Sequence, residues 1–302
     1  MNKIKYGVAF VTGGASGIGQ ALCQEIVRRG GKVAVADIEQ DKAESLAKEL
    51  RAVGGEAIAV HCDVTSRESV EAAYSSTVQT FGKVNLVCAN AGVIVPGPVA
   101  KTRESDMLWM YEVNVFGTLR TIQTFLPALD EAHGRGEFAH LLLTGSENSL
   151  GVPIVGPCSV YTSTKHALLG LADTLRRDLL ASESGVGVTL VCPAVVNTQI
   201  WNATRNRPNS LGGPRQINSA ASEMFSQSNT PESVAIIGLD GCDAAEFLVI
   251  PHPEVESFTR RRADDLNRAM DACLDRVSSL DHSDTAVTSA RHGGVNQEVH
   301  PQ

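Results

Sequence analysis

A glycine-rich segment between a short apolar run and a helical pattern constrains the fold of this chain most strongly. The apolar run is Val8–Val11, the glycine-rich segment is Thr12–Gly19, and the helical pattern extends over residues 20–29. A continuous apolar run is typical of a strand covered on both faces. Glycines let the following backbone approach a pyrophosphate, and a helix N-terminus offers it free N–H groups. The segment therefore predicts a dinucleotide site, although its G-x-x-x-G-x-G spacing is not the commonest pattern.

The alternation of apolar runs and helical patterns continues through most of the chain. Further strands are expected at Lys32–Ala36, Ala57–Cys62, Val84–Ala89, Phe138–Thr144, Val186–Cys192 and Glu246–Ile250. Strands that alternate with helical patterns of about 10 to 15 residues predict right-handed crossovers and a parallel sheet. In such a sheet, ligands bind beyond the carboxyl ends of the strands.

Polar residues stand at several of these strand ends. Asp37 ends the second strand, where its carboxylate can accept hydrogen bonds from ribose hydroxyls and repel a 2′-phosphate, so we expect NAD rather than NADP. Ile38 follows it, and the glycine-rich segment has no Arg or Lys to hold such a phosphate. The alternative for Asp37 is an N-cap of the next helix. Asp63 and Asn90 end the third and fourth strands, and one shared site explains all these positions.

Tyr161 and Lys165 stand four residues apart at the start of a long helical pattern. This spacing places both side chains on one face of a helix. An ammonium beside a phenol favours the phenolate, so the tyrosine pKa is expected to fall and the pair can exchange a proton with an alcohol. The alternative is a surface tyrosine near a solvated lysine.

Composition excludes several classes of protein. The formal net charge of −8 argues against a nucleic-acid partner, and no apolar run is long enough to span a membrane. The N-terminus leads directly into an expected strand, so we expect no signal peptide. The seven cysteines form no C-x-x-C pair, and no histidine stands at metal-ligand spacing, so we expect no metal and a cytoplasmic location.

One domain is expected to extend over residues 1–277. The polar stretch 198–230 is long for a loop inside a compact domain and is interpreted as a substrate lid. A charged helix is expected from Pro253 to Val277, and residues 278–302 are expected to form a polar, flexible tail.

Together these motifs resemble those of the short-chain dehydrogenase/reductase family over Val8–Ile250. The resemblance implies a single-domain, Rossmann-type α/β fold with a doubly wound parallel sheet of about seven strands, flanked by helices on both faces. It also implies a homo-oligomer, either dimer or tetramer. The motifs that carry it are the glycine-rich segment, Asp63-Val64, Asn90-Ala91-Gly92, Asn114, Ser146, Tyr161-x-x-x-Lys165 and Pro193…Thr198.

The resemblance also implies residue roles. Tyr161 would be the general acid/base, and Lys165 would lower its pKa and bind the nicotinamide ribose. Ser146 would hold the substrate oxygen, and Asn114 would anchor a water in a proton relay. The expected cofactor-binding residues are Gly13, Ser16, Gly17, Ile18, Gly19, Asp37, Ile38, Asp63, Val64, Asn90, Ala91, Gly92, Tyr161, Lys165, Pro193, Val196 and Thr198.

Two departures from the family pattern matter. Ala194 follows Pro193 where the family usually has glycine, which puts in doubt the contacts of Val196 and Thr198 with the nicotinamide carboxamide. The interval between the serine and the tyrosine is longer than usual, which leaves Ser149 as a rival to Ser146. The intervening Glu147 and Asn148 are expected as solvent-accessible loop residues, with a substrate contact as the less favoured alternative.

A closer resemblance is to Cα-dehydrogenases that oxidise benzylic alcohols of lignin-derived aryl ethers. It rests on Arg205-x-Arg207-Pro208 and on residues 247–255. It implies an aromatic-binding wall formed by Val152, Ile154, Ile200 and Trp201, for which ordinary packing is the alternative. The expected function is NAD-dependent interconversion of a secondary alcohol and its ketone. The alternatives are a steroid or small-ketone reductase and a catalytically silent dinucleotide-binding sensor.

Overall fold

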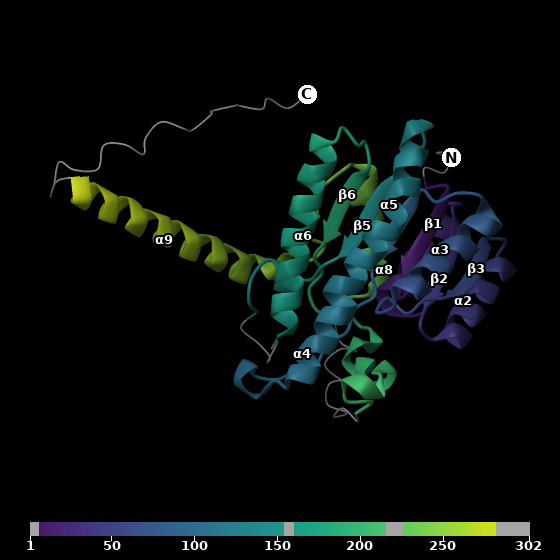
Figure 1. Cartoon of the computed structure of the whole chain (residues 1–302), viewed down its shortest axis with the longest axis horizontal. Helices are drawn as coiled ribbons and strands as arrows, with labels where there is room; N and C mark the ends of the chain where they lie inside the picture. Colours follow the sequence, from purple (N-terminus) through teal and green to yellow (C-terminus); the bar gives the residue numbers. More distant parts are fainter. Residues whose placement is uncertain (1–5, 154–159, 216–225, 227, 282–302) are drawn as a thin grey trace.

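A seven-stranded parallel sheet forms the centre of the molecule, with the strand order β3-β2-β1-β4-β5-β6-β7 (Figure 1). The computed structural model describes residues 6–153, 160–215, 226 and 228–281. The order reverses direction beside β1, as in a doubly wound sheet, so the predicted fold class is confirmed. The strands are β1 Val8–Thr12, β2 Lys32–Asp37, β3 Glu56–His61, β4 Leu86–Ala89, β5 His140–Thr144, β6 Gly187–Val191 and β7 Leu248–Val249.

Helices cover both faces of the sheet (Figure 1). On one face, α1, α2 and α8 pack on one apolar cluster, and on the other face α3, α4, α5 and α6 pack on a second. Side chains alternate along a strand, so in β1 Ala9 and Val11 join the first cluster and Phe10 joins the second. These helices are α1 Gly17–Arg28, α2 Gln40–Ala52, α3 Arg67–Phe81, α4 Glu104–Tyr111, α5 Thr118–Gly134, α6 Tyr161–Ala181 and α8 Pro231–Asp243.

The helical region that runs from α4 to α5 contains a wide turn. Between α4 and α5 the segment Glu112–Gly117 is wound as a π-helix, a form that often marks functional sites. Buried residues fall at every fourth position through this region, at Asp106, Met110, Asn114, Thr118 and Ile122. In an α-helix such spacing would drift around the surface, and the wider winding keeps it on one face.

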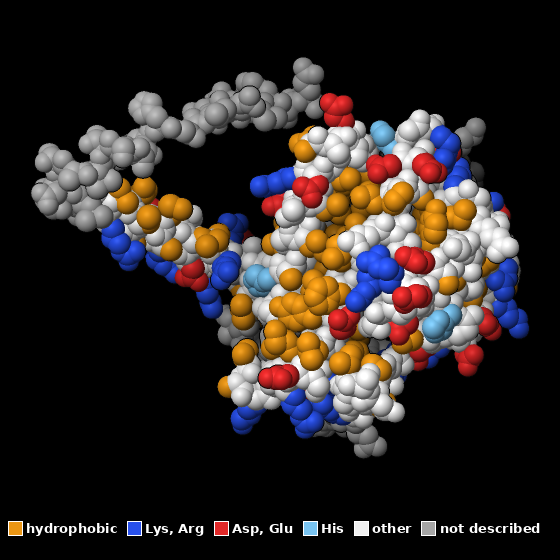
Figure 2. Space-filling model, viewed as in Figure 1, with side chains coloured by type: hydrophobic (Ala, Val, Ile, Leu, Met, Phe, Trp, Pro, Cys, Tyr) orange, Lys and Arg blue, Asp and Glu red, His pale blue; other side chains and the backbone are white. Residues whose placement is uncertain are grey.

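The C-terminal helix α9, Glu256–Asp281, follows a short 3₁₀ turn at Pro253–Val255 and extends away from the sheet (Figure 1). It ends beyond the predicted Val277, and residues 282–302 of the predicted tail lie outside the described residues. Figure 2 shows apolar side chains along one side of α9, where Leu266 and Met270 are exposed. Among the described helices, none combines the length and apolar content needed to cross a membrane.

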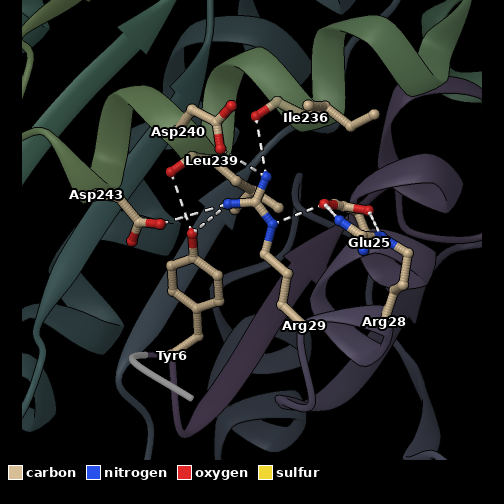
Figure 3. Close-up of polar contacts among 8 residues, drawn as sticks. All are labelled: Tyr6, Glu25, Arg28, Arg29, Ile236, Leu239, Asp240 and Asp243. Carbon is tan, nitrogen blue, oxygen red and sulfur yellow. Dashed lines mark hydrogen bonds and ion pairs between the residues drawn. The ribbon is translucent and has the colours of Figure 1, made fainter. Parts of the chain in front are cut away.

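A polar cluster joins α1 to α8 at the edge of the sheet where the strands begin (Figure 3). We call Tyr6, Glu25, Arg29, Asp240 and Asp243 the Arg29 cluster. The Arg29 guanidinium donates to Glu25 Oε1 at 2.7 Å, to the Tyr6 hydroxyl at 2.9 Å and to Asp240 Oδ1 at 2.8 Å. The Tyr6 hydroxyl in turn donates to the Leu239 carbonyl at 3.1 Å.

Candidate functional site

A central cavity of about 690 Å³ lies beyond the carboxyl ends of the strands. Every predicted catalytic or cofactor-binding residue lines it except Gly19 and Asn114. The sequence-based expectation of one shared site therefore agrees with the position of these side chains. The predicted residues that line it are Gly13, Ser16, Gly17, Ile18, Asp37, Ile38, Asp63, Val64, Asn90, Ala91, Gly92, Ser146, Tyr161, Lys165, Pro193, Val196 and Thr198.

The glycine-rich segment forms the floor at the start of α1. Gly13 and Gly17 have φ angles of +61° and +54°, a region that side chains disfavour. The Ser16 side chain caps no backbone N–H of α1, and the first N–H groups of a helix have no intrahelical acceptor. Gly19 does not line the cavity because it packs directly against the backbone of Gly13. A Cβ at this position would lie 2.0 Å from the Gly13 carbonyl oxygen. The arrangement fits an anionic pyrophosphate.

Asp37 connects the glycine-rich segment to the end of β2. Its Oδ2 accepts from the Ala15 N–H at 3.0 Å, and its Oδ1 accepts from the Glu39 N–H at 2.9 Å. The N-cap residue of α2 is Glu39, so Asp37 orders the chain that enters α2 without capping it. Asp37 is buried and still lines the cavity.

Asn90 holds the glycine-rich segment against β5. Its Nδ2 donates to the Thr12 and Gly13 carbonyls at 3.0 and 3.3 Å, and its Oδ1 accepts from Thr144 Oγ1 at 3.1 Å. Asp63 is held in a similar way, because its Oδ1 accepts from the backbone and hydroxyl of Thr65. Both side chains therefore shape the cavity wall as well as line it.

Tyr161 and Lys165 lie together on the first turn of α6, which begins at Tyr161. Lys165 Nζ is 5.7 Å from the centre of the tyrosine ring and donates to the Thr144 carbonyl at 2.8 Å. The lysine is 2% exposed, and burial lowers its pKa to about 8. This ammonium lines the cavity with one hydrogen bond to the described residues, so its other donors have no acceptor among them.

Asn114 lies behind the cavity wall, in the π-helical turn. Its Oδ1 accepts from the Val93 N–H at 2.8 Å, while its Nδ2 donates to the Val93 carbonyl and to Thr164 Oγ1, each at 3.0 Å. The side-chain amide thus pairs with the chain after β4 as a neighbouring strand would. The described contacts satisfy this side chain, so it supports the residues beside Lys165 from behind.

Ser146 and Ser149 have different positions. Ser146 lines the cavity and its Oγ accepts from the Asn148 N–H at 3.2 Å. Ser149 is 1% exposed, does not line the cavity, and its Oγ accepts from the Ser146 N–H at 3.2 Å. Of the two rivals, Ser146 faces the cavity and Ser149 fixes its backbone.

The expectation that Glu147 and Asn148 are solvent-accessible is wrong. Glu147 is 9% exposed and Asn148 is 4% exposed. The Glu147 N–H donates to the Pro193 carbonyl at 2.7 Å, and Asn148 Oδ1 accepts from Thr162 Oγ1 at 2.7 Å. The loop after β6 and the start of α6 therefore enclose this turn, which local sequence does not reveal.

The loop after β6 tolerates alanine in place of the usual glycine. The Ala194 N–H donates to His252 Nδ1 at 3.1 Å, so the segment after β7 holds this loop. Thr198 packs against the glycine-rich segment, where a Cβ on Gly17 would lie 2.8 Å from Thr198 Cγ2. Pro193, Val196 and Thr198 all reach the cavity.

The described part of the predicted lid begins with two 3₁₀ segments, Gln199–Asn206 and Asn209–Leu211. Ile200 and Trp201 line the cavity as predicted, but Val152 does not and is 59% exposed, because its segment turns outward. Ile154 and residues 216–225 and 227 of the lid lie outside the described residues.

One contact of the predicted lid segment that the sequence did not indicate is an ion pair between Arg205 and Glu39. Arg205 Nη2 lies 2.5 Å from Glu39 Oε2, and the pair joins the Gln199–Asn206 segment to the start of α2. Although burial alone would raise the pKa of Glu39, the hydrogen bonds from Arg205 and Lys42 lower it to about 2. The pair is therefore ionised at neutral pH.

Comparisons with known proteins agree with this geometry. The sequence model of the short chain dehydrogenases matches residues 7–209. The chain belongs to the short-chain dehydrogenase/reductase family. Its motifs in Val8–Ile250 were sufficient to predict this membership.

Relatives of the chain include dehydrogenases with different names. A 1-deoxy-11-beta-hydroxypentalenate dehydrogenase of Streptomyces exfoliatus is 36% identical over 212 residues, which cover 69% of this chain and 74% of the relative. A C alpha-dehydrogenase of Sphingobium is 28% identical over 281 residues, which cover 91% and 87%. A Burkholderia phymatum short-chain dehydrogenase/reductase crystallised with NAD superposes with a TM-score of 0.80 at 30% identity, covering 89% of this chain and 97% of that one.

Proposed function

We propose that this family member is an NAD-dependent dehydrogenase that interconverts a secondary alcohol and its ketone. The observation that carries the proposal is the buried Lys165 beside Tyr161 on the cavity wall, with Ser146 on the same wall. A phenol beside an ammonium can take a proton from an alcohol or return it to a ketone. When bound, the nicotinamide would accept or donate the hydride.

Each residue of this wall has a distinct proposed task. Ser146 Oγ would hold the substrate oxygen, since it lines the cavity and its backbone is fixed by Ser149. Tyr161 would transfer the proton, and Lys165 would stabilise the phenolate and bind the nicotinamide ribose. Asn114, which does not touch the cavity, would keep the π-helical turn and Thr164 in place and so position Lys165, with a relay water beside it.

The proposed cofactor is NAD. Asp37 and Ile38 line the adenosine side of the cavity, where a carboxylate suits ribose hydroxyls and opposes a 2′-phosphate. Glu39 adds a second carboxylate there, and its negative charge is engaged by Arg205. The relative crystallised with NAD supports the same choice.

The proposed substrate is bulky or aromatic. Large apolar side chains of the lid, the α4 face and α9 line the cavity, including Ile200, Trp201, Trp109 and Phe258. The similarity to a C alpha-dehydrogenase over most of the chain supports a benzylic alcohol.

The test is NADH formation by the purified protein with benzylic alcohols and hydroxysteroids in parallel. We expect turnover of benzylic alcohols with NAD, and Tyr161→Phe should lower it about a thousandfold while NAD binding survives. Tyr111→Phe is the matched control, because the Tyr111 hydroxyl donates to Ser163 and does not line the cavity. Binding of NAD without turnover of any alcohol would favour a silent sensor and contradict the proposal.

We further propose a homotetramer in the cytoplasm. Exposed apolar residues on α4, the π-helical turn and α6, among them Leu108, Phe116 and Leu180, supply a surface for self-association (Figure 2). Five of the six cysteines in the described residues are buried thiols, and none of those six is in a disulfide, which supports a reducing compartment. Sedimentation of the purified protein tests the assembly.

A further inference from the structure

His252 lies between β7 and α9 and is buried behind the loop that follows β6. It is 5% exposed, and its Nδ1 accepts a hydrogen bond from the Ala194 N–H at 3.1 Å. A ring nitrogen that accepts carries no proton, so this imidazole is neutral with its proton on Nε2. Burial lowers the pKa of His252, and the charge of Glu254 opposes this shift without cancelling it. The form that accepts from Ala194 is therefore the one present at neutral pH.

The other ring nitrogen of His252 contributes nothing to the fold. Nε2 is buried and has no hydrogen-bond partner within the described part of the chain. A buried donor without an acceptor destabilises the folded state, so an apolar side chain would suit this position better if stability alone mattered. The contact that gives the histidine a use is the hydrogen bond at Nδ1.

Ala194, the partner of His252, stands where the family usually has glycine. It packs in a small apolar cluster with Val255 and Phe258, at the start of α9. The segment after β7 therefore holds the loop after β6 in two ways, through an apolar contact with the alanine side chain and through a hydrogen bond to its N–H. Glycine would keep the hydrogen bond and lose the apolar contact.

The loop that is held in this way forms part of the cavity wall. Pro193, Ala194, Val196 and Thr198 all line the central cavity. We propose that His252 is a positioning residue for the nicotinamide end of the cofactor, because it fixes the backbone that leads to Val196 and Thr198. The inference rests on the proposed function, since it requires NAD as the cofactor, and it assigns to the segment after β7 a task that the family motifs do not contain.

The test compares two ligands that differ at one end. Calorimetric titrations measure the binding of NAD and of ADP-ribose, which lacks the nicotinamide. His252→Leu removes the acceptor and should weaken NAD binding about tenfold while ADP-ribose binds as before. His252→Phe keeps a ring without an acceptor and should give the same result, so the test does not depend on the folding of one variant.

Two further variants separate positioning from stability. His252→Asn carries an amide oxygen as many bonds from Cα as Nδ1 and should restore NAD binding to within about threefold of the unmodified protein. His140→Leu is the matched control, because His140 is also buried, lies within hydrogen-bond distance of Thr189 Oγ1 and does not line the cavity. It should lower stability and leave the affinity for both ligands unchanged.

The possible outcomes distinguish this inference from the proposed function. Unchanged NAD binding in His252→Leu and His252→Phe, or an equal loss for NAD and ADP-ribose, would overturn the role of His252. Failure of His252→Asn to restore NAD binding would overturn it as well, because the acceptor would then not be the cause. NAD binding that depends on His252, without oxidation of any alcohol, would contradict the dehydrogenase reaction and leave the positioning role standing.

Discussion

The Arg29 cluster and the central cavity both bury charged side chains, but they pair them in opposite ways. The Arg29 guanidinium is surrounded by acceptors from α1, α8 and the chain before β1 (Figure 3). Lys165, at the opposite end of the sheet, has a single hydrogen bond to the Thr144 carbonyl among the described residues. Glu147 lines the same cavity, and its carboxyl group accepts no hydrogen bond from the residues that the structure describes.

This difference separates polar groups that hold the fold from those available to a ligand. A buried charge with all its hydrogen bonds satisfied stabilises one packing arrangement, whereas an unsatisfied one weakens the folded state until something binds. The direction of the Lys165 pKa shift fits this view, because burial lowers it and no described carboxylate offsets the effect. Removing the buried charge of the cavity wall should therefore lower turnover and raise stability, whereas removing the centre of the Arg29 cluster should lower stability and leave turnover unchanged.

The largest effect is expected from Lys165→Met. Turnover should fall about a thousandfold, since the variant loses the group that favours the phenolate. The free energy of unfolding at pH 7 should rise by about 2 kcal/mol, because relief of the pKa shift is worth about 3 kcal/mol and the lost hydrogen bond to Thr144 about 1.

The pH dependence of stability tests whether burial of the Lys165 ammonium is the cause of this gain. The pKa of Lys165 is lowered from 10.5 to about 8 in the folded protein, so the cost of burying the ammonium is complete below pH 8 and disappears as pH rises toward 10.5. In urea titrations, the advantage of Lys165→Met should shrink between pH 7 and pH 10. An advantage that stays constant would show that desolvation of the charge is not its cause.

Arg29→Met should show the reverse pattern. The variant removes the guanidinium that pairs with the buried Glu25, the Tyr6 hydroxyl and Asp240, and it should lower the free energy of unfolding by about 3 kcal/mol. Turnover should not change, because the cluster is remote from the cavity. Arg28→Met is the control, since Arg28 is exposed and, within the described part of the chain, pairs only with Glu25, so this variant should change the free energy of unfolding far less than Arg29→Met. Loss of turnover in Arg29→Met would show that the Arg29 cluster also affects the reaction, and it would contradict the distinction between the two regions.

Asp37 has features of both kinds of polar group. Its oxygens accept backbone hydrogen bonds, as in a group that holds the fold, and its side chain still lines the cavity. Asp37→Ala should weaken NAD binding about tenfold and relax the rejection of NADP, since the repulsion of a 2′-phosphate is removed. Fluorescence titrations with both cofactors measure the ratio. Asp41→Ala, on the exposed first turn of α2, should leave it unchanged. Unchanged selectivity in Asp37→Ala would reduce this residue to a backbone-ordering role.

The smallest effect is expected from Glu147→Gln on stability. The pKa of Glu147 is raised from 4.5 to about 7 in the folded protein. The protonated carboxyl therefore contributes to the stability of the folded state below pH 4.5, and this contribution is lost as pH rises through 7. Relative to the unmodified protein, the variant should gain about 1 kcal/mol between pH 5 and pH 8, a value discounted for solvent in the cavity. Urea titrations at both pH values measure it, and a difference that does not change with pH would place Glu147 among the satisfied groups.

The sequence predicted those features that local pattern determines. Apolar runs located the strands, and the order of polar residues at their ends predicted the shared cavity. The burial of Glu147 could not be predicted in this way, because it depends on Pro193 and Glu254, which are distant in sequence. The ion pair between Glu39 and Arg205 could not be predicted either, because these two residues are also distant in sequence.

Other differences arise from local geometry that residue types do not specify. The spacing around Asn114 suits a helix of either winding, so the π-helical turn was not predicted. Val152 is apolar, like Ile200 and Trp201, but the direction of its segment depends on contacts formed elsewhere. The roles of the individual site residues stay predictions until the variants are measured.

The wide turn at Glu112–Gly117 makes the helix sensitive to length more than to residue type. Removing one residue there would tighten the winding and rotate the part that follows by about 100° relative to α4. Asn114 would swing away from Val93, and the apolar side of α5 would meet water. A single-codon deletion in this turn should therefore be far more harmful than most exchanges within it, because the two halves of the helix would fall out of phase.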